Sequence, residues 1–134
     1  MFQPRKVKFL KQHKLKFRGN KYNKAKLKFG IYGIQSLETS YITVNQIEAV
    51  RKILKNYIRP FGKLWILIYP FKPITQVSEG SRMGSGKGNV NSWVSLVKTG
   101  QIIFEIDNLS LSLVKEASSL ISNKLPIKIR LITK

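Results

Sequence analysis

The chain has 134 residues, a length that suits one domain with a hydrophobic core of its own. Lys and Arg outnumber Asp and Glu by 25 to 6, and the formal net charge of +19 indicates a polyanionic partner. Because there is no cysteine and His13 is the only histidine, disulfides and thiolate metal sites are excluded, and we expect no metal, no cofactor and no catalytic triad.

The N-terminal stretch from Arg5 to Lys28 holds eleven basic residues, no acidic residue and several interleaved aromatic residues. This pattern favours a segment that runs between RNA phosphates and stacks on bases. A disordered basic tail and an organelle import sequence are the alternatives, but import sequences favour Arg and Ser, whereas this stretch is rich in Lys. We predict that residues 1–28 form an RNA-binding extension that becomes ordered only on RNA.

Membrane association is not expected. The basic stretch lacks the single apolar face of a membrane-surface helix, and no apolar run in the chain reaches the ~20 residues that span a bilayer.

The folded body is expected over residues 29–134 as a single domain. Residues 29–34 read as a first strand, Thr43 and Gln46 fit a capping box, and a helix follows that ends before Pro60. Residues 63–69 read as a buried strand, and residues 71–91, rich in glycine and poor in apolar periodicity, read as a long loop.

The second half is expected to begin with a β-hairpin of residues 93–97 and 102–106. Ser110 is the candidate N-cap of a second helix, and residues 127–132 alternate apolar and basic side chains as a half-buried strand does. The predicted fold class is α+β, a two-layer sandwich of two helices on one mixed or antiparallel sheet, with a basic N-terminal extension and a long glycine-rich loop.

The glycine-rich loop invites comparison with nucleotide-binding motifs, but it fits neither. The Walker pattern fails at Ser81 and Gly88, and the dinucleotide pattern fails at Asn89. What remains is a backbone that can approach an RNA phosphate closely, with Arg82 and Lys87 on its flanks. An ordinary flexible hairpin tip is the alternative.

Acidic residues offer little basis for catalysis. Glu105 and Asp107 alternate near a strand end and share a face, but without a nearby histidine such a pair is more typical of a turn or a salt bridge. An enzyme that uses the loop for nucleotide phosphates and a general nucleic-acid-compacting protein are the rival functions, and we expect neither enzymatic activity nor a small-molecule substrate.

Several ordered segments resemble the large-subunit ribosomal protein L-sixteen family, also called universal L-sixteen, from end to end. The segments include Gln3-Pro4-Arg5-Lys6, Phe29-Gly30, Gln46-Ile47-Glu48-Ala49, Lys72-Pro73-Ile74-Thr75, Arg82 to Asn89 with Trp93-Val94, and Lys124 to Lys128. The resemblance implies a structural constituent of the large ribosomal subunit that binds rRNA near the aminoacyl-tRNA site and the peptidyl transferase centre. Its partners would be large-subunit rRNA, tRNA in the A or P site, and neighbouring large-subunit proteins.

The residues expected to bind rRNA are basic residues of the extension and the first helix, and one at the following strand: Arg5, Lys6, Lys8, Lys11, His13, Lys14, Lys16, Arg18, Arg51, Lys55 and Lys63. The residues expected to lie near tRNA form the loop: Arg82, Met83, Gly84, Ser85, Gly86, Lys87 and Gly88. Many bacterial members of the family have Lys where Ser85 stands, and the extension between His13 and Phe29 is Lys-rich where they are rich in Gly and Arg.

Amino-acid usage bears on origin. Lys outnumbers Arg by 19 to 6, and Ile and Asn are plentiful, as an AT-rich genome imposes. Together with an N-terminus that starts directly on the family motif, this usage predicts an organellar ribosome, in a mitochondrion first and a plastid as the alternative.

Overall fold

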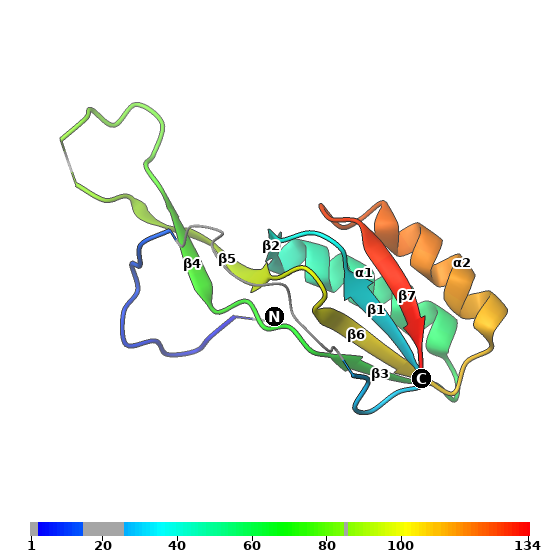
Figure 1. Cartoon of the computed structure of the whole chain (residues 1–134). Coiled ribbons are helices and arrows are strands. Elements are labelled where there is room, and N and C mark those ends of the chain that lie inside the picture. Colours follow the sequence, from blue (N-terminus) through cyan, green and yellow to red (C-terminus); the bar gives the residue numbers. More distant parts are fainter. Residues whose placement is uncertain (1–2, 15–25, 85) are drawn as a thin grey trace.

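The computed structural model describes residues 3–14, 26–84 and 86–134. In these ranges the chain forms two antiparallel sheets, and both helices cover one face of the larger sheet (Figure 1). The elements in chain order are β1 (Tyr32–Ser36), β2 (Ser40–Thr43), α1 (Val44–Ile58), β3 (Lys63–Ile66), β4 (Lys72–Gln76), β5 (Asn89–Val97), β6 (Ile102–Asp107), α2 (Leu111–Ser122) and β7 (Ile129–Thr133).

The α+β class is confirmed, but the single predicted sheet is wrong. One sheet has the order β3-β6-β1-β7 and the other has the order β2-β5-β4. The predicted hairpin of β5 and β6 is also wrong, since β5 pairs with β2 and β4 while β6 pairs with β1 and β3. The turn between them directs the chain from one sheet to the other, and there Gly100, at φ 86°, donates its N–H to Ser36 O at 2.7 Å.

The predicted long loop is shorter than residues 71–91. Strand β4 and the first part of β5 occupy both ends of that range and leave residues 77–88 as the connection. Pro73 argued against a strand here, because a proline has no N–H group to donate to a neighbouring strand. Strand β4 accommodates it because β4 is an edge strand of the smaller sheet.

Helix α1 begins as the sequence predicts. Thr43 Oγ1 accepts the N–H of Gln46 at 3.3 Å, and Gln46 Oε1 accepts the N–H of Thr43 at 2.9 Å, so both halves of the capping box are present. The helix ends at Ile58, ahead of Pro60. Its buried side chains recur at helical spacing: Val44, Ile47, Val50, Leu54 and Ile58.

Helix α2 keeps the predicted start but differs in detail. Ser110 is the N-cap residue, yet its side chain makes no capping hydrogen bond. The helix buries Val114, Ala117 and Ile121. Tyr57 of α1 donates its hydroxyl to Glu116 at 2.9 Å, which links the two helices at their outer surface.

The main core lies between the helices and the face of the larger sheet that they cover, called the first face. Ile34 of β1 and Phe104 and Ile106 of β6 are at most 1% exposed and pack with the buried residues of both helices. Alternation along a strand sends every second side chain to the opposite face. No helix among the described residues covers that second face (Figure 1).

The residues just before β1 cover part of this second face. Glu105 of β6 is fully buried there and accepts the backbone N–H groups of Lys28 at 3.1 Å, Phe29 at 2.6 Å and Gly30 at 2.9 Å. Gly30 must be a glycine, because a Cβ at this position would lie 2.5 Å from the carbonyl oxygen of Ile106. The predicted first strand therefore begins later, at Tyr32, since residues 28–30 bind a carboxylate instead of a neighbouring strand.

These contacts set the ionisation of Glu105. Burial by itself raises the pKa of the carboxyl group, but the hydrogen bonds from the N–H groups of Gly30, Phe29 and Lys28 outweigh it, and the pKa lies below its usual value. A carboxylate whose pKa is lower in the folded state contributes its full stabilisation above the unfolded pKa. That contribution is lost as the pH falls through the folded pKa.

We predict that Glu105→Gln lowers the free energy of unfolding at neutral pH by about 1.5 to 3 kcal/mol, because hydrogen bonds to a charged acceptor are replaced by bonds to a neutral one. Urea unfolding of the two proteins measures the difference. The difference in stability should narrow as the pH falls below the usual range of a glutamate pKa and through the lowered pKa of Glu105, because the wild-type carboxylate is then protonated.

Glu38→Gln is the matched control, because the Glu38 carboxylate meets the exposed ammonium group of Lys128 at 3.7 Å and is itself partly exposed. Its effect should stay within about 0.5 kcal/mol. Equal stability of Glu105→Gln and wild type at neutral pH would contradict the anchoring role of Glu105.

Candidate nucleic-acid interface

The basic residues of the N-terminal segment, defined as residues 3–14, are all exposed. This group contains Arg5, Lys6, Lys8, Lys11, His13 and Lys14. The segment runs beside β4 and β5, at the end of the molecule away from the helices (Figure 1). Two further predicted contacts, Lys16 and Arg18, lie outside the described residues.

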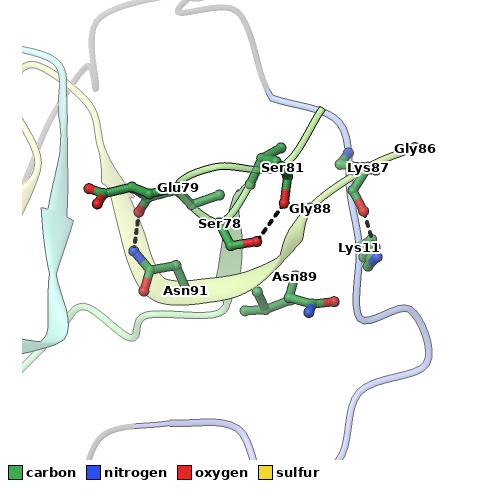
Figure 2. A pocket seen from close by; sticks show the side chains of 12 residues that line it. Lys11, Ser78, Glu79, Ser81, Gly86, Lys87, Gly88, Asn89 and Asn91 are labelled. Carbon is green, nitrogen blue, oxygen red and sulfur yellow. Dashed lines mark hydrogen bonds between the residues drawn. The ribbon is translucent and has the colours of Figure 1, made fainter. Parts of the chain in front are cut away.

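A reciprocal pair of lysine contacts joins this segment to the base of the loop. Lys11 Nζ donates to the carbonyl oxygen of Lys87 at 2.8 Å (Figure 2). In return, Lys87 Nζ donates to the carbonyl oxygen of Gln12 at 2.7 Å. Lys72 of β4, only 7% exposed, adds a contact from its Nζ to Gln12 Oε1 at 3.2 Å. Two basic parts of the chain that are far apart in sequence are thereby held together without any carboxylate in these contacts.

The loop of residues 77–88 projects beyond the small sheet (Figure 1). Its neck is narrow, because a Cβ on Gly88 would overlap the carbonyl oxygen of Gln76, so only glycine fits there. At the tip, Gly84 and Gly86 have positive φ, and Arg82 and Met83 are exposed. Ser85 lies outside the described residues.

Between the N-terminal segment and the loop lies an open groove of about 490 Å3 (Figure 2). Two side-chain hydrogen bonds shape its walls: Ser78 Oγ to Ser81 Oγ at 2.7 Å and Asn91 Nδ2 to Gln76 Oε1 at 2.5 Å. It is lined by Lys11, Gln76, Val77, Ser78, Glu79, Ser81, Gly86, Lys87, Gly88, Asn89, Val90 and Asn91.

Most of these lining groups suit contacts with a sugar-phosphate backbone, because ammonium groups, hydroxyls and amides all donate hydrogen bonds to it. Sequence analysis missed Asn89 and Asn91, since both were read as loop residues and not as the start of β5. Alternating polar residues ahead of Trp93 are the signal that could have found them.

A second basic group lies at the C-terminal end of α1. Arg51, Lys55 and Arg59 line a depression of about 410 Å3 between this helix and β3. Arg51 binds Glu48 through Nε at 2.9 Å and Nη2 at 2.5 Å, and this hydrogen bonding lowers the pKa of Glu48 and raises the pKa of Arg51. Arg51 and Lys55 were predicted as rRNA contacts, whereas Arg59, placed on the same basic side of the predicted helix, was not.

Lys63 falls on a third surface. It is exposed at the start of β3, and its partner in the strand register is Asp107 of β6. Two residues further along β3, Trp65 is the register partner of Glu105, so Lys63 lies on the second face of the large sheet. The predicted rRNA-binding residues with described positions therefore divide among the N-terminal segment, the end of α1 and this sheet face.

Among the described residues, no cluster of three or more His, Asp or Glu side chains could hold a metal ion. No helix in that part of the chain has the length and apolar composition to cross a membrane. The two acidic residues that the sequence placed on one face have separate partners. Glu105 binds backbone N–H groups, while Asp107 is opposite Lys63 in the strand register.

We predict that the double change Lys11→Ala and Lys87→Ala releases the N-terminal segment from the loop base. Cleavage by chymotrypsin after the exposed Phe9 should become faster, because both reciprocal hydrogen bonds are lost. The unfolding midpoint of the body should barely change, as is usual for exposed sites.

The control is the double change Lys115→Ala and Lys124→Ala, which removes the same charge at and just beyond α2. Its cleavage rate should match that of the wild type. Equal rates for all three proteins would show that the lysine contacts do not hold the segment.

Comparisons with known proteins agree with the resemblance seen in the sequence. The family model described as ribosomal protein L16p/L10e matches residues 4–132. "Large ribosomal subunit protein uL16" of Trichodesmium erythraeum strain IMS101 is 46% identical over 134 residues, covering 100% of this chain and 98% of that protein. "Large ribosomal subunit protein uL16c" of Cyanidium caldarium is 45% identical over 133 residues, covering 99% and 95%. The uL16 protein of Karelsulcia muelleri strain GWSS is 43% identical over 134 residues, covering 100% and 98%.

The family model covers nearly the whole chain, and these relatives match it from end to end. The surfaces described above are basic and projecting, as a constituent of an RNA particle requires. The chain belongs to the ribosomal protein L16p/L10e family and is a structural constituent of the large ribosomal subunit, not an enzyme.

Proposed function

We propose that the chain binds large-subunit rRNA through its N-terminal segment and the basic end of α1, and that the loop of residues 77–88 contacts tRNA at the aminoacyl-tRNA site near the peptidyl transferase centre. The P site is the alternative location of the tRNA contact. Membership of the family supports a place in the subunit with rRNA and other ribosomal proteins as partners. The finer assignment rests on this chain's own surfaces.

The observation that carries the proposal is the reciprocal contact of Lys11 and Lys87. It joins the N-terminal segment and the loop into one projecting basic surface, although the bonded residues are 75 and 76 positions apart in sequence. A surface of this kind contributes little to the core, since its residues from Ser78 to Gly84 are exposed. Its charge and its reach beyond the body favour contact with a second polyanion beside the rRNA that holds the body in place.

The two loop cations have different roles in the proposal. Lys87 Nζ donates to the carbonyl oxygen of Gln12 and positions the segment. Arg82 is exposed near the tip of the loop, and three glycines follow it in the sequence. Arg82 is the proposed tRNA contact because it is exposed near the loop tip and a guanidinium group can bind a phosphate through two parallel hydrogen bonds.

The compartment is also a proposal. The excess of Lys over Arg, with many Ile and Asn residues, predicted a mitochondrion first. The relatives are bacterial and plastid proteins, and they favour a plastid ribosome over a mitochondrial one. Co-sedimentation with large subunits from each purified organelle would decide between them.

We predict that binding to a large-subunit rRNA fragment weakens steeply with salt. Replacing Arg5, Lys6 and Lys8 by Ala should reduce the slope of log affinity against log salt by about 2 to 3, at roughly 0.7 to 0.9 per phosphate contact. Filter binding over a salt series measures it. Replacing Lys115, Lys124 and Lys128 instead should leave the slope unchanged, and an equal loss in both variants would mean that only total charge matters.

We predict that Arg82→Ala slows accommodation of aminoacyl-tRNA in subunits that carry the variant, while the unfolding midpoint of the free protein stays within the small range of exposed sites. Single-turnover peptide-bond formation measures accommodation. Lys115→Ala is the control for loss of one exposed charge. If both variants translate equally well, the loop is a passive hairpin tip.

A further inference from the structure

An exposed pair of stacked aromatic rings lies on the second face of the large sheet. Phe29 and Trp65 have ring centroids 5.8 Å apart and ring planes 18° from parallel. Trp65 is half-buried, but Phe29 is 57% exposed even though one of its faces lies against the tryptophan. A phenylalanine that was needed only for packing would be expected to turn inward.

The position of Phe29 is fixed by the backbone and not only by the ring contact. Its own N–H donates to Glu105 Oε2 at 2.6 Å, and the N–H groups on either side of it bind the same carboxylate. A rigidly held ring loses little conformational entropy when a second ring stacks on it. The geometry is thus that of a prepared stacking surface.

The charges around this pair indicate the kind of partner. Lys28 precedes Phe29 and is exposed, and Lys63 is exposed two residues before Trp65 on the same face of β3. Arg130, on the opposite edge strand β7, is exposed. It lies on this face too because it is two residues from Ile132, whose side chain would meet a Cβ on Gly33 at 3.1 Å. Of the acidic residues here, Glu105 is fully buried under residues 28–30, which leaves Asp107 beside Lys63.

We propose that the exposed face of Phe29, backed by Trp65, is a stacking platform for one unpaired RNA base, with Lys28 and Lys63 bound to the phosphates on either side. The proposal deepens the proposed rRNA binding and rests on it. Aromatic rings stack on unpaired bases of any sequence, and adjacent cations neutralise the backbone. A protein partner would be less suited to a surface so rich in cations.

The test compares two single-stranded oligoribonucleotides with equal numbers of phosphates, one normal and one abasic, in binding to the full-length chain. Phe29→Leu should lower the affinity for the normal strand by roughly 5- to 100-fold, the range found when one stacked base is lost, and leave the affinity for the abasic strand unchanged. Phe29→Tyr, which keeps a ring, should bind as the wild type does.

Phe71→Leu is the matched control, because Phe71 is 53% exposed and lies outside this pair, and it should bind both strands as the wild type does. Phe29→Met repeats the measurement without a ring should the Leu variant melt lower than the wild type. The platform is wrong if the ringless variants bind the normal strand as the wild type does, or if they lose affinity for both strands equally. In either case salt-dependent binding of both strands by the wild type would leave the proposed function intact, whereas no binding of either strand would count against both.

Discussion

The buried carboxylate of Glu105 anchors residues 28–30, and the N-terminal extension joins the folded body through this interaction. A fully buried, ionised side chain is tolerated only when its oxygens are well supplied with donors, and three successive backbone N–H groups supply them. The same bonds fix where the N-terminal extension leaves the body. Residues 28–30 also cover part of a sheet face that no helix of the described residues covers, and Phe29 stacks there on Trp65.

A second constraint governs the far end of the molecule. Like charges gathered on the N-terminal segment and the loop repel one another, yet Lys11 and Lys87 each donate to a backbone carbonyl of the other element. Carbonyl oxygens satisfy the ammonium groups without neutralising them, so the surface keeps its full positive charge for a polyanion. Ile42 of β2 and Val97 of β5 belong to the main core, so the small sheet that carries the loop is packed onto the body.

Local signals in the sequence predicted much of the fold. The capping box at Thr43 and Gln46, the helical spacing of α1 and the stop before Pro60 depend on neighbours within a few residues, and all three are present. Pairing between distant strands was harder to foresee. The β5–β6 connection looks like a hairpin in sequence, but β5 and β6 belong to different sheets. Strand β4 was not predicted because it contains Pro73. The predicted boundary at Lys28 remains a prediction, although the anchor reaches back to that residue.

Composition and the family resemblance predicted which segments form the candidate site, but not how these segments lie in space. Charge alone marked the extension and the loop, whereas the role of Lys87 as a link to Gln12 needs the two segments in space. Arg59 was recognised as part of the basic side of the helix but not as a contact, and the anchoring role of Glu105 was missed because, without a nearby histidine, Glu105 and Asp107 were read as a turn or salt-bridge pair. The Glu105 anchor depends on contacts between residues 75 to 77 positions apart in the chain, which no local pattern encodes, whereas the depression at Arg59 is formed by residues 51–66.

The central claim is that the body docks on rRNA and holds the loop tip toward tRNA. A photoreactive amino acid at the exposed Met83 position, in large subunits loaded with aminoacyl-tRNA, tests it most directly. The account predicts a cross-link to the acceptor arm of the tRNA that disappears when the tRNA is omitted. Cross-links to ribosomal proteins or rRNA alone, equal with and without tRNA, would contradict it.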